Sequence, residues 1–90
     1  MEKCVTIQVT GKVQGVWFRK SAQDMAKKLS IKGYAKNNVD GTVTIEACGE
    51  KKNLDKMIAW CRKGSRLAKV ENIMHTYSDK KHRFDDFSIL

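Results

Sequence analysis

The hydrophobic period of the chain changes across residues 11–19, and this change constrains the fold more than any other feature of the sequence. Before it, residues 4–10 alternate apolar and polar side chains, which is the period of a half-buried strand. After it, apolar residues recur at the spacing of one helix face, which predicts a helix over residues 18–30. The segment between them contains Gly11 and Gly15, whose backbones can adopt the positive φ angles that a tight turn needs. The sequence therefore predicts a strand, a glycine-containing loop and a helix in direct succession.

The same two periods recur along the rest of the chain. Further elements are predicted at 33–39 (strand), 42–48 (strand), 54–61 (helix), 70–77 (strand) and 87–89 (short strand). Turn residues at 39–41 join two of the strands into a hairpin, and Gly64 is placed to cap the second helix. The order β-α-β-β-α-β predicts an α+β fold, a ferredoxin-like split sandwich with an antiparallel sheet and both helices on one face. Residues 1–90 are expected to form a single domain.

Strand geometry predicts a close pair of cysteines. A right-handed crossover leaves room for the third strand between the first two, antiparallel to the first. Matching the apolar faces of these strands sets Val5 near Ala47, and the same register places Cys4 opposite Cys48 on the face without helices. We expect these two cysteines to lie close enough to form a disulfide on oxidation, although a reducing cytoplasm favours free thiols. Cys61 is expected to stay buried and unpaired.

The loop that follows the first strand has the chemistry of an anion site. Several backbone N–H groups at a strand–loop–helix junction can point at one anion, and the helix dipole assists them. Arg19 falls in the first turn of the predicted helix, where a cation opposes the dipole at a cost of roughly 0.3–1 kcal/mol. A residue that breaks a local rule at such a junction indicates a bound anion. We therefore interpret the segment as a phosphate-binding loop that includes Arg19.

Asn37 is the second candidate residue. Strand interiors disfavour asparagine, although a solvent-facing asparagine near a turn is common. In the predicted topology the first and second strands end at the same end of the sheet. The two strand ends are roughly 10 Å apart, because one strand lies between them. Arg19 and Asn37 could then both reach one ligand.

Two segments resemble the signature of the acylphosphatase family. They are Gly11–Arg19, which reads Gly-Lys-Val-Gln-Gly-Val-Trp-Phe-Arg, and Gly33–Val43, closed by Gly49. The resemblance covers nearly the whole chain and implies the same ferredoxin-like fold. It also implies hydrolysis of the carboxyl–phosphate bond of acyl phosphates to a carboxylate and inorganic phosphate. Ser30 and Ser65 depart from the family, which commonly has glycine and proline there, and this affects local stability more than chemistry.

The resemblance assigns roles to individual residues. Arg19 corresponds to the family's catalytic, phosphate-binding arginine. Backbone amides assist it from the preceding residues Gln14, Gly15, Val16, Trp17 and Phe18. Asn37 corresponds to the asparagine that orients the attacking water, and the substrate's own phosphate assists deprotonation of that water. Trp17 occupies a variable position, where it either forms one wall of the pocket or packs beside Tyr34.

The remaining composition indicates a metal-free, water-soluble enzyme. The two histidines, His75 and His82, lie outside the motifs and the three cysteines form no Cys-x-x-Cys unit, so no metal and no cofactor is expected. No 18-residue apolar stretch or signal-peptide pattern occurs, which excludes a membrane partner and favours the cytoplasm. We expect a monomer whose partners are small acyl phosphates and inorganic phosphate.

Two other functions fit the same fold. The net charge of +8, from 18 basic and 10 acidic residues, also suits a nucleic-acid-binding module. Such modules place stacking aromatic residues on the open face of the central strands, whereas that face is predicted here to carry none over residues 4–10 and 42–48. A nucleic-acid partner is therefore not expected. A sensor that binds a small anion in the same loop without turnover remains open on sequence grounds.

Overall fold

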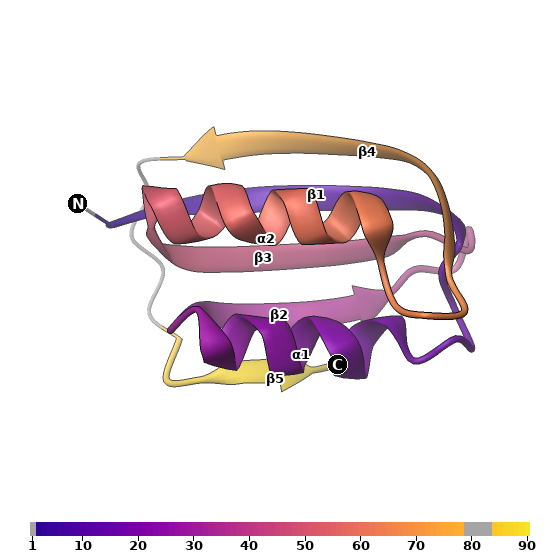
Figure 1. Ribbon diagram of the computed structural model, residues 1–90, viewed down its shortest axis with the longest axis horizontal. Helices are drawn as coiled ribbons and strands as arrows, with labels where there is room; N and C mark the ends of the chain where they lie inside the picture. The colour runs from indigo at the N-terminus through magenta and orange to yellow at the C-terminus, as the bar shows by residue number, and fades with distance from the viewer. Residues whose placement is uncertain (1, 79–83) are drawn as a thin grey trace.

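A computed structural model describes residues 2–78 and 84–90 as one five-stranded sheet with two helices on one of its faces (Figure 1). The strand order is β4-β1-β3-β2-β5. The elements are β1 (Glu2–Lys12), α1 (Phe18–Lys28), β2 (Lys32–Asn37), β3 (Val43–Glu50), α2 (Lys51–Lys63), β4 (Lys69–Ser78) and β5 (Phe87–Ile89). The predicted α+β class, element order and ferredoxin-like arrangement are confirmed. Among the described residues, no helix is long and apolar enough to cross a bilayer.

The central pairing follows the predicted register. β3 lies antiparallel to β1 between β1 and β2, with Val5 opposite Ala47 and Cys4 opposite Cys48. β4 pairs antiparallel with the other side of β1. The short β5 pairs parallel with β2, which the sequence did not indicate, so one edge of the otherwise antiparallel sheet is parallel. This edge pairing brings residues 87–90 next to β2.

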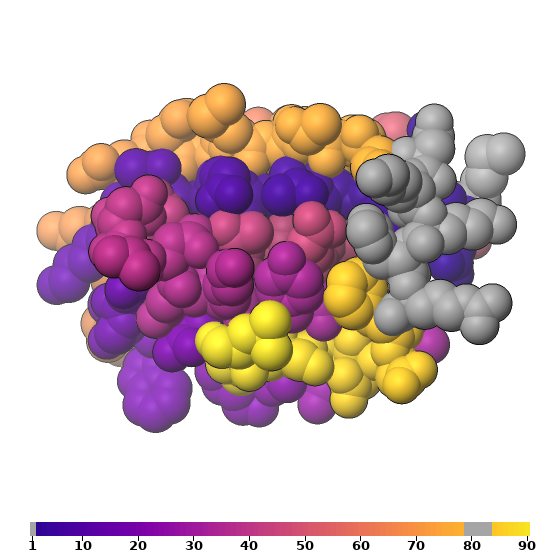
Figure 2. All heavy atoms as spheres, turned by 180° about the vertical axis from the view of Figure 1, so that it is seen from behind, coloured from indigo at the N-terminus to yellow at the C-terminus, as the bar shows by residue number. Residues whose placement is uncertain are grey.

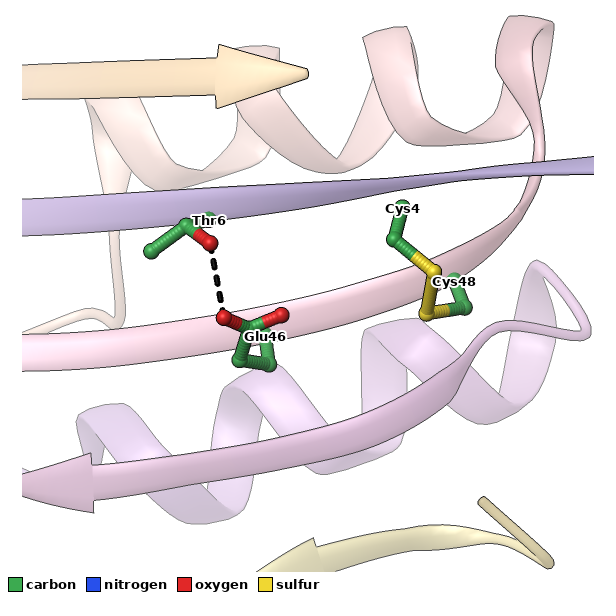
Figure 3. The surroundings of a disulfide bond; sticks show 4 residues. All are labelled: Cys4, Thr6, Glu46 and Cys48. Atoms are coloured by element: carbon green, nitrogen blue, oxygen red, sulfur yellow. Dashed lines mark hydrogen bonds between the residues drawn. A yellow bond between two sulfur atoms is a disulfide. The ribbon is translucent and has the colours of Figure 1, made fainter. Parts of the chain in front are cut away.

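The two faces of the sheet differ in chemistry. Toward the helices, β1 and β3 present fully buried apolar side chains, and Phe18 at the start of α1 is 1% exposed in the same core. Figure 2 shows the opposite face, where the side chains of the strands lie in rows uncovered by helices. There Cys4 and Cys48 are joined by a disulfide, and Thr6 donates a hydrogen bond to Glu46 at 2.7 Å (Figure 3). Cys61 is free and buried on the helix side, and burial raises the pKa of its thiol to about 12.

The far end of α1 closes with a Schellman motif. The N–H of Ile31 donates to the carbonyl of Ala26 at 2.8 Å, and the N–H of Ser30 donates to that of Lys27 at 3.3 Å. Ser30 has φ 54°, a left-handed conformation that glycine adopts more readily. This cap turns the chain directly into β2 and so fixes where β2 begins.

Candidate active site

The loop between β1 and α1 leaves the start of α1 open toward solvent. Trp17 precedes the helix with φ 63°, makes no side-chain capping hydrogen bond, and no acidic residue lies in the first turn. Gly15 also has a positive φ, 71°, and a Cβ there would meet no atom within 4 Å. Because the first amides of a helix have no partner within it, an uncapped start offers N–H donors to an external anion. The predicted phosphate-binding loop therefore leads into a helix start that has no side-chain cap.

Side chains from three places hold this loop. The Nε2 of Gln14 donates to the carbonyls of Asn38 at 2.8 Å and Thr42 at 3.0 Å. The buried hydroxyl of Ser65 donates to the carbonyl of Val16 at 2.7 Å. Phe18 anchors the C-terminal side of the loop in the core. Sequence reasoning considered only the backbone amide of Gln14 and missed the Ser65 contact, because both side-chain bonds join distant segments.

The turn between β2 and β3 is a second fixed component. Asn38 donates through Nδ2 to the hydroxyls of Thr42 at 2.9 Å and Thr44 at 2.7 Å. Asp40 accepts hydrogen bonds from the hydroxyl and the N–H of Thr42, which lower the pKa of its carboxyl. Because Gln14 binds the same turn, the loop and the turn form one unit at the end of the sheet.

Asn37 carries an unpaired polar atom at this end. It is the last residue of β2 and lies opposite Val43, a fully buried residue of the helix-covered face. Its Oδ1 is buried and has no hydrogen-bond partner in the described part of the chain. Buried polar atoms are normally paired, and an unpaired one in a native fold calls for a ligand or an ordered water. The neighbouring Asn38 has a structural role, which leaves Asn37 as the asparagine available to a ligand.

Arg19 is held at the same end by the segment after β5. Its Nη1 donates to the carbonyl of Leu90 at 2.8 Å, and the N–H of Leu90 donates to the carbonyl of Ala35 at 2.9 Å. Ala35 precedes Asn37 by two residues on β2, so both side chains lie on the helix-covered face of this strand. The structure therefore brings the two predicted site residues to one region. The contribution of residues 87–90 was not predicted, since their pairing with β2 leaves no pattern in the sequence.

A cleft of about 500 Å³ opens beside this loop. It is lined by Val13, Gly15, Trp17, Phe18, Arg19, Lys20 and Ile89. Among the described residues, no group of three His, Cys, Asp or Glu side chains is placed to hold a metal ion, and His82 lies outside the described ranges. Arg19 and Lys20 are the charged residues of this lining, most of the others are apolar, and Asn37 is not among them.

Known acylphosphatases are similar to this chain over most of its length. The acylphosphatase profile matches residues 5–89. The acylphosphatase of Clostridium acetobutylicum is 56% identical over 68 residues, 76% of this chain and 75% of that protein. The acylphosphatase of Legionella pneumophila (strain Lens) is 43% identical over 70 residues, which are 78% of this chain and 77% of that protein. The crystal structure of acylphosphatase from Bacillus subtilis superimposes with a TM-score of 0.95 at 37% identity, covering 100% of this chain and 99% of that one.

These matches agree with the two sequence segments and with the fold, and they extend over most of each relative. The chain therefore belongs to the acylphosphatase family, enzymes that hydrolyse acyl phosphates.

Proposed function

We propose that Arg19 and the loop amides bind the phosphate of an acyl phosphate while Asn37 orients the attacking water, without a metal ion. The observation that carries this proposal is the buried, unpaired Oδ1 of Asn37 at the same end of β2 as the guanidinium of Arg19. The amides are those of Gln14, Gly15, Val16, Trp17 and Phe18. A guanidinium remains charged at working pH and has five N–H donors, so its contact with Leu90 leaves donors for phosphate oxygens.

The bond changes balance with the substrate and one water. The water oxygen attacks phosphorus and the bond from phosphorus to the acyl oxygen breaks, so that the carboxylate leaves with the electron pair. A proton of the water passes to a phosphate oxygen, because none of the described residues lining the cleft is Asp, Glu or His. The Oδ1 of Asn37 accepts a hydrogen bond from the same water and holds it in line. Positioning and electrostatic stabilisation are the main contributions a protein makes to phosphoryl transfer.

Turnover of benzoyl phosphate tests the proposed function directly. We expect hydrolysis in the presence of EDTA, with inorganic phosphate as a competitive inhibitor. Activity that EDTA removes and a divalent ion restores would overturn the metal-free mechanism. Phosphate binding without any turnover would instead favour an anion sensor.

Two variants separate the proposed roles. Arg19→Ala should abolish phosphate binding measured by calorimetry, together with turnover. Asn37→Ala should still bind phosphate but lose about 10²-fold or more in kcat, the usual scale for one missing group that acts in the transition state. Lys56→Ala removes one charge from the exposed side of α2 and serves as the control. Equal loss of phosphate affinity in the Arg19 and Asn37 variants would contradict this division of roles.

The proposal also includes the setting of the enzyme, a cytoplasmic monomer without a nucleic-acid partner. The strands at the centre of the open face support the last point, because β1 and β3 place Thr6, Gln8, Thr44 and Glu46 there and no aromatic residue. The open-face aromatic contact on β2 is a pair between Tyr34 and Phe84, with ring centroids 5.9 Å apart. Light scattering after size exclusion should give a mass near 10.3 kDa.

A further inference from the structure

We propose that Trp17 and Ile89 form an acyl-group subsite that selects flat, apolar acyl groups, aromatic ones above all. This inference rests on the proposed function, because it takes the phosphate of the substrate to be bound at Arg19. An acyl phosphate with its phosphate at Arg19 must place its acyl group against the rest of the lining. That lining is mainly apolar and includes Val13, Trp17 and Ile89.

Packing does not explain the backbone conformation of Trp17 or the exposure of its side chain. Its side chain is 74% exposed, although a large aromatic residue is usually placed where its area is buried. Its φ of 63° is rare for a bulky residue and costs of order 1 kcal/mol or more. It also occupies the position before α1 where a capping side chain would be favourable, and it makes no capping bond. Such a combination at a cleft points to a role in binding.

The alternative considered from the sequence, that Trp17 packs beside Tyr34, does not match the ring contact that Tyr34 makes. Tyr34 makes its ring contact with Phe84 on the open face of the sheet. Trp17 instead belongs to the lining of the cleft, together with Arg19. The structure therefore favours the pocket-wall interpretation of Trp17 over the packing one.

Ile89 supplies a second apolar surface from another element. It pairs with Ala35 of β2, so its side chain lies on the helix-covered face of the sheet, on the same side as the cleft. It is 39% exposed, although its neighbour Phe87 on the same face is 2% exposed in the core. The next residue, Leu90, accepts the hydrogen bond of Arg19. One short segment thus positions the phosphate-binding guanidinium and contributes an apolar wall.

The charge at the rim argues against acidic acyl groups. Lys20 is the other basic residue of the lining, but its Nζ lies 3.3 Å from Asp24 and 3.2 Å from the Oε1 of Gln23. A carboxylate on the acyl group would have to compete with Asp24 for that lysine. An apolar ring between Trp17 and Ile89 meets no such competition and removes apolar surface from water.

Two stable phosphonates that differ only in the acyl end provide the test. Phenacylphosphonate and acetonylphosphonate replace the bridging oxygen by CH₂ and carry a phenyl and a methyl group, respectively. We expect calorimetry to show about tenfold tighter binding of the phenyl compound to the unmodified chain, the scale of one good aromatic contact. Trp17→Ala and Ile89→Ala should each reduce that ratio severalfold. Met74→Ala, which truncates an exposed apolar side chain on β4 at the opposite edge of the sheet, should preserve it.

Fluorescence gives an independent readout of the same contact. The chain has two tryptophans, and in Trp60→Phe only Trp17 remains. Phenacylphosphonate should shift or quench this emission at saturation, whereas saturating acetonylphosphonate should change it far less. Equal affinities for the two compounds, both displaced by inorganic phosphate, would overturn the acyl subsite and leave the proposed function standing. If neither phosphonate binds and inorganic phosphate does not bind either, the proposed phosphate site itself is overturned.

Discussion

At the residue scale, the loop between β1 and α1 is held by a hydroxyl from the connection between α2 and β4. Ser65 is 8% exposed and donates to the carbonyl of Val16. We predict that Ser65→Ala lowers the free energy of unfolding by about 1–3 kcal/mol, because it leaves that carbonyl without its partner. Turnover should fall as well, since the loop amides lose their fixed orientation.

Urea unfolding and benzoyl phosphate kinetics on the same preparation test this prediction. Ser88→Ala is the matched control, because the Ser88 hydroxyl donates to the exposed carboxylate of Asp86 at 3.1 Å. This substitution should change stability by less than about 0.5 kcal/mol. A Ser65→Ala protein as stable and active as the parent would show that the contact with Val16 does not hold the loop.

The sequence pattern indicates some of the candidate site residues and not others. Arg19 and Asn37 each break a local preference, one of a helix start and one of a strand, which makes both of them candidates in the sequence. The role expected of Asn37 came from the family resemblance. Gln14 and Ser65 break no local rule. Their side chains bond partners at separations of up to 28 and 49 residues, which depend on the folded arrangement alone.

At the element scale, the end of α1 has a residue poorly suited to its conformation. Ser30 sits at the left-handed position of the Schellman motif with φ 54°. We predict that Ser30→Gly stabilises the protein by about 0.5–1 kcal/mol, because glycine adopts this φ without a Cβ clash. Ser30→Ala retains the Cβ and should give no gain. Thermal and urea unfolding of the two variants decide the matter, and equal effects of Gly and Ala would exclude backbone strain as the cause.

The packing of α2 against the edge strand β4 includes a hydrogen bond that should be visible in a pH titration. The hydroxyl of Tyr77 donates to Asp55, whose carboxylate also binds Lys51 at 3.0 Å. Burial first, and then this contact with Asp55, raises the pKa of Tyr77 to about 12. The folded state therefore favours neutral Tyr77. Its contribution to stability is complete below the ordinary tyrosine pKa of about 10 and is lost as the pH rises through 12.

Absorbance of tyrosinate near 295 nm measures this directly. In Tyr34→Phe only Tyr77 remains, and we predict a midpoint near pH 12 for the folded protein. The midpoint should be lower when Asp55→Asn is added. A midpoint near 10 in the folded protein would show that the contact does not persist in solution.

The element boundaries show what apolar periodicity can reveal. It predicted the second helix over 54–61, whereas α2 runs over Lys51–Lys63. The additional residues 51–53 and 62–63 are polar and none of them is buried, so they leave no periodic signal. The second strand was predicted to reach residue 39. It ends at Asn37 because the N–H of Asn38 already donates to the carbonyl of Thr42 in the turn.

At the scale of the whole molecule, the bond between Cys4 and Cys48 closes a sequence separation of 44 residues. We predict that the oxidised protein is more stable than the reduced one by about 2–4 kcal/mol, because the link restricts the unfolded chain. Urea unfolding with and without dithiothreitol measures the difference, and Cys4→Ser should be insensitive to the reductant. Identical curves for the oxidised and reduced parent protein would contradict the prediction.

Because Arg19 contacts Leu90, the position of its guanidinium depends on a residue that is translated much later than Arg19 itself. Translation delivers β1, α1, β2 and β3 long before residues 87–90 leave the ribosome, and the partner of Arg19 lies 71 residues further along the chain. A chain that has been made only as far as β4 contains β1, β2 and β3 of the sheet, yet its Arg19 lacks the carbonyl of Leu90 that positions the guanidinium. If Arg19 binds phosphate as proposed, the anion should therefore bind fully only after β5 has docked on β2. A bound anion would then stabilise the chains in which β5 has docked.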